Sequence, residues 1–166
     1  MEMIFKIILN QDFEELTAYF NETNILLKDV INSRDKKSGY TPLMSALTGK
    51  EKRIVELLIE NGANVNVEDK QGRSPLHLAC TFNNLDYCKI LIANGANIHK
   101  IDEHGNQPLW NATHNAVYEG GDVEIIKLLI KMGADPSHGI DSGITPLSFA
   151  RDFGSKEIFE LLSKKF

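Results

Sequence analysis

The sequence predicts an all-α protein, a solenoid in which about five helix–turn–helix units with β-turn tips stack in a row. Two short patterns recur in phase along its 166 residues. In the first, a glycine is followed three residues later by Pro-Leu, beginning at Gly39, Gly72, Gly105 and Gly143. The second is Gly-Ala-Asn or Gly-Ala-Asp, beginning at Gly62, Gly95 and Gly133. Both patterns repeat every 33 residues until a last step of 38, so they define one period and one break in it.

Each unit carries the signals of two helices. Thr41, Ser74 and Thr145 occupy helix N-cap positions, and the proline after each suits the first helical position, where no N–H is needed. The second helix has an apolar stripe, as in RIVELLIENG and EIIKLLIKMG. The glycine of the second pattern then falls where a left-handed C-cap ends a helix. The links between units are rich in Asn, Asp and Gly and predict tight turns.

These patterns resemble the ankyrin repeat family, whose unit is a turn plus two antiparallel helices with a T-P-L-H-x-A signature. SPLHLA at residues 74–79 is the closest copy, and TPLMSA, QPLWNA and TPLSFA are degenerate copies in phase with it. The resemblance covers residues 32–166 and implies units at about 35–66, 68–99, 101–137 and 139–166, the last of them a C-terminal capping repeat. Residues 1–31 are expected to form a divergent N-terminal capping repeat, because a solenoid needs terminal units that cover its core. Whether they pack as a true repeat stays open.

The third unit has a five-residue insert, which lies between Trp110 and Gly121. No helix breaker occurs there before Gly120, so the sequence predicts a first helix that is extended by more than one turn. This helix would end in a projecting Gly-Gly loop with Tyr118 near its tip. A tolerated insertion without function is the alternative, because loops accept extra length at little cost.

No residue pattern in the chain indicates catalysis. His77 and Cys80 lie three apart, on one face of a helix, but the repeat accounts for both, as the signature histidine and a small packing residue. Cys88 is likewise interpreted as a core residue. The other histidines, His99, His104, His114 and His138, lack the helical spacing of paired metal ligands. We therefore expect no enzyme activity, metal, cofactor or small-molecule substrate.

Composition limits the partner and the compartment. The net charge of −5 argues against nucleic acid, which requires clustered Lys and Arg, and would suit a basic protein. The N-terminal stretch MEMIFKIILNQDFEEL has neither the cleavage site of a signal peptide nor the length of a membrane span. Two cysteines offer no disulfide framework. We expect a cytoplasmic protein with no membrane partner.

The exposed surface is then the expected place of function. In this architecture the turn tips and the first helices line a concave face. Tyr40, Arg73 and Asn106 share one register position and should line up along the tips. The residues predicted to bind a partner protein are Tyr40, Lys70, Gln71, Arg73, Phe82, Glu103, His104, Asn106, Trp110, His114, Tyr118, Asp141 and Ile144.

A second resemblance concerns function. GNQPLWNA and EIIKLLIKMGADP make the chain similar to small stand-alone bacterial ankyrin repeat proteins. Some proteins of that kind are immunity proteins, each of which binds and neutralises a toxin. The resemblance implies a non-enzymatic protein–protein interaction module that acts as an inhibitor. The alternative is a cytosolic adaptor or regulatory scaffold with no toxin partner.

Overall fold

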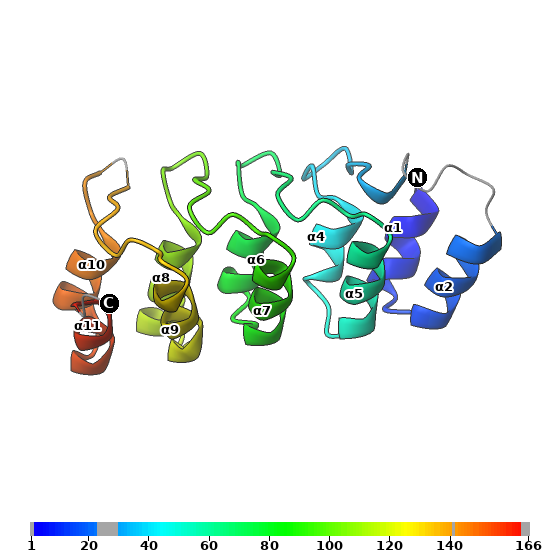
Figure 1. The fold of residues 1–166 in the computed structure, drawn as a ribbon. Coiled ribbons are helices and arrows are strands. Elements are labelled where there is room, and N and C mark those ends of the chain that lie inside the picture. The colour runs from blue at the N-terminus through cyan, green and yellow to red at the C-terminus, as the bar shows by residue number, and fades with distance from the viewer. Residues whose placement is uncertain (1, 23–29, 141, 164–166) are drawn as a thin grey trace.

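The computed structural model describes residues 2–22, 30–140 and 142–163 of the chain. Its helices come in successive pairs (Figure 1). The pairs are α1 (Glu2–Leu9) with α2 (Phe13–Glu22), α4 (Pro42–Ala46) with α5 (Lys52–Glu60), α6 (Pro75–Thr81) with α7 (Leu85–Ala93), α8 (Pro108–Tyr118) with α9 (Val123–Lys131), and α10 (Pro146–Phe153) with α11 (Lys156–Ser163). No strand occurs within the described ranges. The loops that link successive pairs project along one edge of the molecule (Figure 1).

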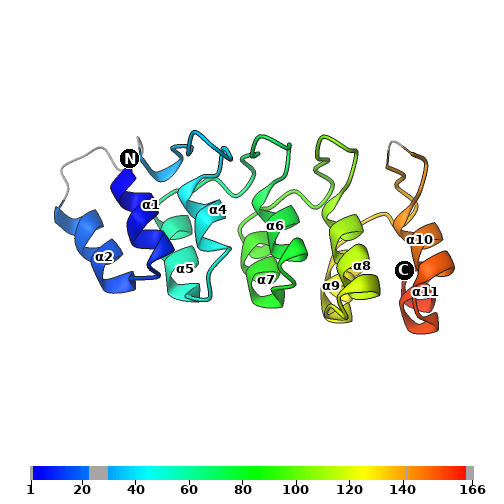
Figure 2. The ribbon, with the colours of Figure 1, turned by 180° about the vertical axis from the view of Figure 1, so that it is seen from behind.

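The pairs stack into two layers. The first helices α1, α4, α6, α8 and α10 contact one another in that order, and so do the second helices α2, α5, α7, α9 and α11. Figures 1 and 2 show the stack from opposite sides, with the two chain ends at opposite ends of it. This arrangement confirms the predicted all-α solenoid.

The helix boundaries follow the capping residues. The side-chain oxygens of Thr41, Ser74 and Thr145 each accept the backbone N–H three residues on, and a proline follows each of them. Gln107 is the N-cap residue of α8, but its side chain makes no capping hydrogen bond, so Pro108 alone marks the start of this helix. Gly62 follows α5 with a φ of 90°, in the left-handed region that glycine adopts readily.

The insert lengthens α8, as predicted. α8 has 11 residues whereas α6 has 7, and the four additional residues make slightly more than one turn. The extension is bonded to the preceding unit, because the Asn115 side chain donates to the backbone oxygen of Thr81 at 3.1 Å. Beyond the helix, the backbone N–H of Asp122 donates to the side chain of Asn83 at 2.8 Å. The lengthened segment is therefore bonded to the preceding unit on both sides of Gly120 and Gly121, where a projecting loop was expected.

The first helix pair continues the stack at the N-terminal end. α1 packs against α4, and α2 packs against α5. The side-chain oxygen of Gln11 accepts the backbone N–H groups of Lys50 and Glu51 at 2.9 and 2.8 Å, which joins the α1–α2 loop to the α4–α5 loop. Of the segment NILLKDV, expected to connect this unit to the next, all but Val30 lies outside the described residues. None of the described helices is long and apolar enough to cross a membrane.

Candidate protein-binding surface

The hairpin tips are held by the carboxylates of three aspartates, Asp35, Asp69 and Asp102. Asp69 accepts the backbone N–H groups of Gln71 and Arg73, both at 2.9 Å, and Asp102 holds the next hairpin in the same way. Successive tips are also joined, since the N–H of Lys70 donates to Ser38 O at 3.1 Å. This backbone hydrogen bond fixes the position of one hairpin relative to the next.

The register position shared by Tyr40, Arg73 and Asn106 is more constrained than the sequence indicates. The guanidinium of Arg73 donates to the Asp69 carboxylate at 2.8 Å and to the Tyr40 hydroxyl at 3.0 Å, so these side chains bind one another. Asn106 is only 9% exposed because its amide donates to the Asp102 carboxylate. Its side chain is thus withdrawn from the surface, whereas Tyr40 and Arg73 remain half-buried.

Most of the other residues predicted to bind a partner are exposed, and one of them lies outside the described residues. Lys70, Gln71, Glu103, His104 and Ile144 are exposed at the hairpins, and Phe82 is exposed at the end of α6. Asp141 lies outside the described residues. Their contact with a partner stays a prediction.

Five aromatic rings gather on α8 and α10 and form what we call the aromatic cluster: Trp110, His114, Tyr118, Phe149 and Phe153. Phe149 lies at its centre, with ring centroids 5.0 Å from Trp110, 5.7 Å from His114, 5.6 Å from Tyr118 and 5.4 Å from Phe153. Phe149 is buried, whereas Tyr118 and Phe153 are 56% and 62% exposed. A group of packed rings with exposed members is a surface that a partner can cover.

Three members of this cluster are among the residues predicted to bind a partner, although their gathering was not predicted. Trp110, His114 and Tyr118 follow one another at intervals of four, which places them on one face of α8. Phe149 and Phe153 were missed, although their own interval of four in PLSFARDF is the signal that could have identified them. A small hollow of about 220 Å³ adjoins Trp110 and His114. The side chains of Asn111 and Asn115 line it and donate to Thr81.

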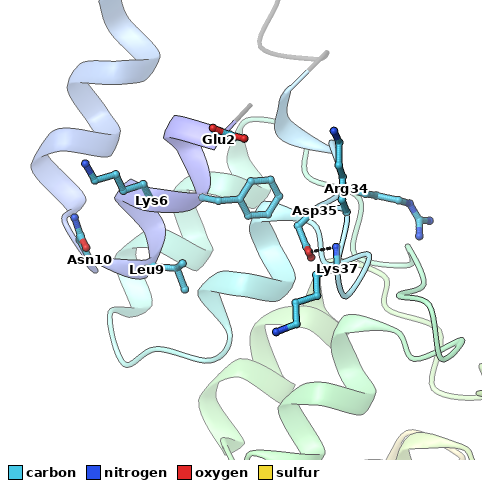
Figure 3. A pocket seen from close by; sticks show the side chains of 9 residues that line it. Glu2, Lys6, Leu9, Asn10, Arg34, Asp35 and Lys37 are labelled. Carbon is cyan, nitrogen blue, oxygen red and sulfur yellow. Dashed lines mark hydrogen bonds between the residues drawn. The ribbon is translucent and has the colours of Figure 1, made fainter.

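A larger hollow of about 790 Å³ lies at the other end of the stack, between α1 and residues 34–37 (Figure 3). A second hollow of about 330 Å³ adjoins it, because Phe5, Leu9 and Asp35 line both. Tyr40 lines the second hollow. We call the two together the N-terminal groove. The repeat pattern could not reveal it, since α1 precedes the first repeated glycine.

Basic side chains surround the larger hollow of this groove. They are Lys6 from α1 and Arg34, Lys36 and Lys37 from the loop before α4, and the acidic residues are Glu2 and Asp35. Figure 3 shows Lys6 on one side of the hollow and Arg34 and Lys37 on the other. The run SRDKKSG was the signal in the sequence for the loop side of this site.

The structure places His77 and Cys80 in the core, where both are fully buried. His77 bonds to Ser74 Oγ at 2.8 Å and to the backbone oxygen of Asn106 at 2.9 Å, so it links two units. The hydrogen bond to Cys88 and burial raise the pKa of the Cys80 thiol, which opposes formation of a nucleophilic thiolate. Within the described residues, no group of three His, Cys, Asp or Glu side chains could hold a metal ion.

Comparison with known families agrees with this geometry. Residues 15–102, more than half of the chain, match the family described as ankyrin repeats in three copies. The chain belongs to the ankyrin repeat family. Residues 76–130 also match ankyrin repeats described as many copies. Ankyrin repeats imply a protein–protein interaction module.

One curated relative is Ankyrin repeat and SOCS box protein 3 of Bos taurus. It is 50% identical over 44 residues, which are 26% of this ankyrin repeat chain and 8% of the relative. The chain therefore spans less than a tenth of that relative's length.

Proposed function

We propose that this ankyrin repeat protein binds one partner protein through the aromatic cluster and the hairpin tips, and that binding blocks the partner's activity. Its role is then that of a non-enzymatic inhibitor. The aromatic cluster carries the proposal, because the lengthened α8 brings Tyr118 into a group of rings that stays partly exposed. Tyrosine and tryptophan are among the residues that most often dominate binding energy at interfaces.

Neutralisation of a toxin is the form of inhibition that we favour. The similarity of GNQPLWNA and EIIKLLIKMGADP to small bacterial ankyrin repeat proteins supports it, since some of those are immunity proteins. The alternative is an adaptor or regulatory scaffold, which would use the same surface but leave the partner's activity unchanged. The effect on the partner therefore separates the two roles.

Photo-crosslinking tests whether the aromatic cluster meets a partner. A photoreactive amino acid replaces Tyr118 in one variant and Lys127, an exposed residue of α9, in the control. We expect one host protein to be crosslinked from position 118 and not from position 127. The purified partner is then assayed with an equimolar amount of the ankyrin repeat protein. Loss of its activity supports an inhibitor, and unchanged activity supports the adaptor.

Replacement of Trp110, which is half-buried, or of Tyr118, which is exposed, should weaken binding to that partner. We expect Trp110→Ala and Tyr118→Ala each to cost about 2 kcal/mol, roughly thirtyfold in Kd by isothermal titration calorimetry. Met132→Ala removes an exposed apolar side chain at the end of α9 and should leave the affinity unchanged. Circular dichroism confirms that each variant is folded. Unchanged affinity in both aromatic variants would remove the cluster from the interface.

A further inference from the structure

The N-terminal groove has a local charge opposite to that of the whole chain. Four basic residues, Lys6, Arg34, Lys36 and Lys37, and two acidic residues, Glu2 and Asp35, line its larger hollow. The hollow therefore has a surplus of two positive charges in a chain whose net charge is −5. Such a local reversal attracts the opposite charge to this place on the surface.

Asp35 is one of the two acidic residues already subtracted in this count, and hydrogen bonds of its own turn occupy its carboxylate oxygens. Its oxygens accept the backbone N–H groups of Lys37, Ser38 and Tyr40 at 2.8, 2.9 and 2.8 Å, and also the Ser38 hydroxyl. Burial opposes ionisation of Asp35, but these hydrogen bonds outweigh it and lower its pKa to about 2. Asp35 therefore stays ionised, and the donors of its own turn occupy its carboxylate oxygens.

The basic side chains are available to a partner. Lys6, Arg34, Lys36 and Lys37 are exposed, and none of them forms an ion pair within the described part of the chain. The Arg34 guanidinium donates to the backbone oxygen of Glu68, which leaves its charge without an acidic counterpart. A carboxylate from outside would meet several donors here.

The floor of the N-terminal groove is apolar. Phe5 and Tyr40 are half-buried, and Leu9 is 67% exposed. The larger hollow, at about 790 Å³, lies within the range of about 300–1,000 Å³ that is usual for ligand pockets. A large apolar side chain that covers Leu9 and Phe5 would remove this surface from water.

We propose that the N-terminal groove binds an acidic segment of the partner protein, in which one large apolar side chain lies on Phe5 and Leu9. Aspartates or glutamates that flank this side chain pair with Lys6, Lys36 and Lys37. This proposal rests on the proposed function, since it names a second contact of the same partner. The aromatic cluster and the N-terminal groove then hold the partner at the two ends of the stack.

Charge complementarity favours a protein segment over nucleic acid. A phosphate backbone needs an extended basic surface, whereas the basic groups here surround one apolar floor and the rest of the chain is acidic. An acidic and apolar segment matches both parts of the groove. The competing occupant is a second copy of this chain, which would make the protein a dimer through this face.

A phage-displayed library of random peptides, selected on the whole protein, tests the proposal. We expect the enriched peptides to combine Asp or Glu with a central Phe, Trp or Leu. One of them is then synthesised, and its Kd is measured by fluorescence anisotropy. The double variant Lys36→Glu/Lys37→Glu should weaken it about tenfold or more, because like charges then face one another. Lys89→Glu/Lys131→Glu, at exposed residues of α7 and α9, makes the same change in net charge and should leave the Kd within about twofold.

Three results would overturn the proposal: no enrichment, enriched peptides without an acidic excess, or equal weakening by both charge reversals. Light scattering measures whether the protein is a dimer. A dimer that dissociates in the Lys36→Glu/Lys37→Glu variant and not in the control variant would show that a second copy of the chain occupies the groove, against the proposal. The peptide assay does not involve Tyr118, so its failure leaves the crosslinking result standing. A failure of crosslinking from position 118 with intact peptide binding would instead reject the aromatic cluster alone.

Discussion

The side chain of His77 joins two repeats from within the core. Its Nδ1 atom accepts the backbone N–H of Ser74 at 3.1 Å, and its Nε2 atom lies 2.9 Å from the backbone oxygen of Asn106 in the next hairpin. With Nε2 as the donor, the neutral ring satisfies both groups. A side chain without these two functions would leave buried backbone groups unpaired, so the signature histidine is structural in this chain.

The stability of the protein should fall as His77 becomes protonated. Burial lowers the pKa of His77 below its ordinary value of 6.5, and the Asn106 carbonyl and the Asp102 carboxylate offset only part of that effect. The unfolded chain then binds a proton at higher pH than the folded chain. Stability due to this residue is full above pH 6.5 and is lost as pH falls toward the folded-state pKa.

The variant His77→Gln tests this prediction by urea unfolding at pH 7 and pH 5. At pH 7 we expect it to be about 2 kcal/mol less stable than the wild type, because buried hydrogen bonds are lost. Between pH 7 and pH 5 the wild type should lose more stability than the variant. An equal loss in both proteins would assign the pH dependence to other groups.

At the scale of the elements, the hairpins form a stack of their own. The N–H of Glu103 donates to Gln71 O at 3.0 Å, so one hairpin lies close against the next. Gly72 lies at this contact with a φ of 74°, and a Cβ atom added to it would meet Glu103 N at 3.0 Å and Asp102 C at 3.2 Å. The close approach of two backbones therefore requires glycine here, in addition to the positive φ.

A pair of glycine substitutions separates these two requirements. Gly62 also has a positive φ, of 90°, but a Cβ atom there would meet nothing within 4 Å. Gly62→Ala should cost roughly 1–2 kcal/mol, from the left-handed backbone alone. Gly72→Ala should cost roughly 1 kcal/mol more, because the neighbouring hairpin must also move. The free energies of unfolding in urea give this comparison, and similar losses in both variants would show that the hairpins part easily.

The helices and their order could be predicted from the sequence because their signals are local and repeated. Caps, prolines and the terminal glycines act within a few residues, and each of these patterns recurs in phase along the chain. The exposure of a hairpin residue depends on which side chain it meets, so the register of Asn106 was predicted but its burial by Asp102 was not. The N-terminal groove could not be predicted, because it depends on the packing of α1 against α4 and no repeated sequence pattern indicates that packing.

The whole molecule is a linear array in which each helix pair contacts its neighbours. Two helix pairs, α4–α5 and α6–α7, separate α1 from α8, so a change at the first pair reaches α8 only through intervening interfaces. In such an array, stability is approximately a sum of unit and interface contributions, and an end can unfold while the rest stays folded. The single tryptophan, Trp110, lies in α8 and reports on that part of the array.

Core substitutions at different places should therefore have different effects on Trp110. Ile7 in α1 and Leu129 in α9 are both fully buried, and replacement of either by alanine should cost about 2–5 kcal/mol locally. We expect Leu129→Ala to lower the urea midpoint seen by Trp110 fluorescence. Ile7→Ala should instead cause an early partial loss of helical circular dichroism, with a smaller shift in the fluorescence midpoint. If Ile7→Ala moves both signals together and as far as Leu129→Ala does, the five pairs unfold as one cooperative unit and the interfaces are stronger than the units they join.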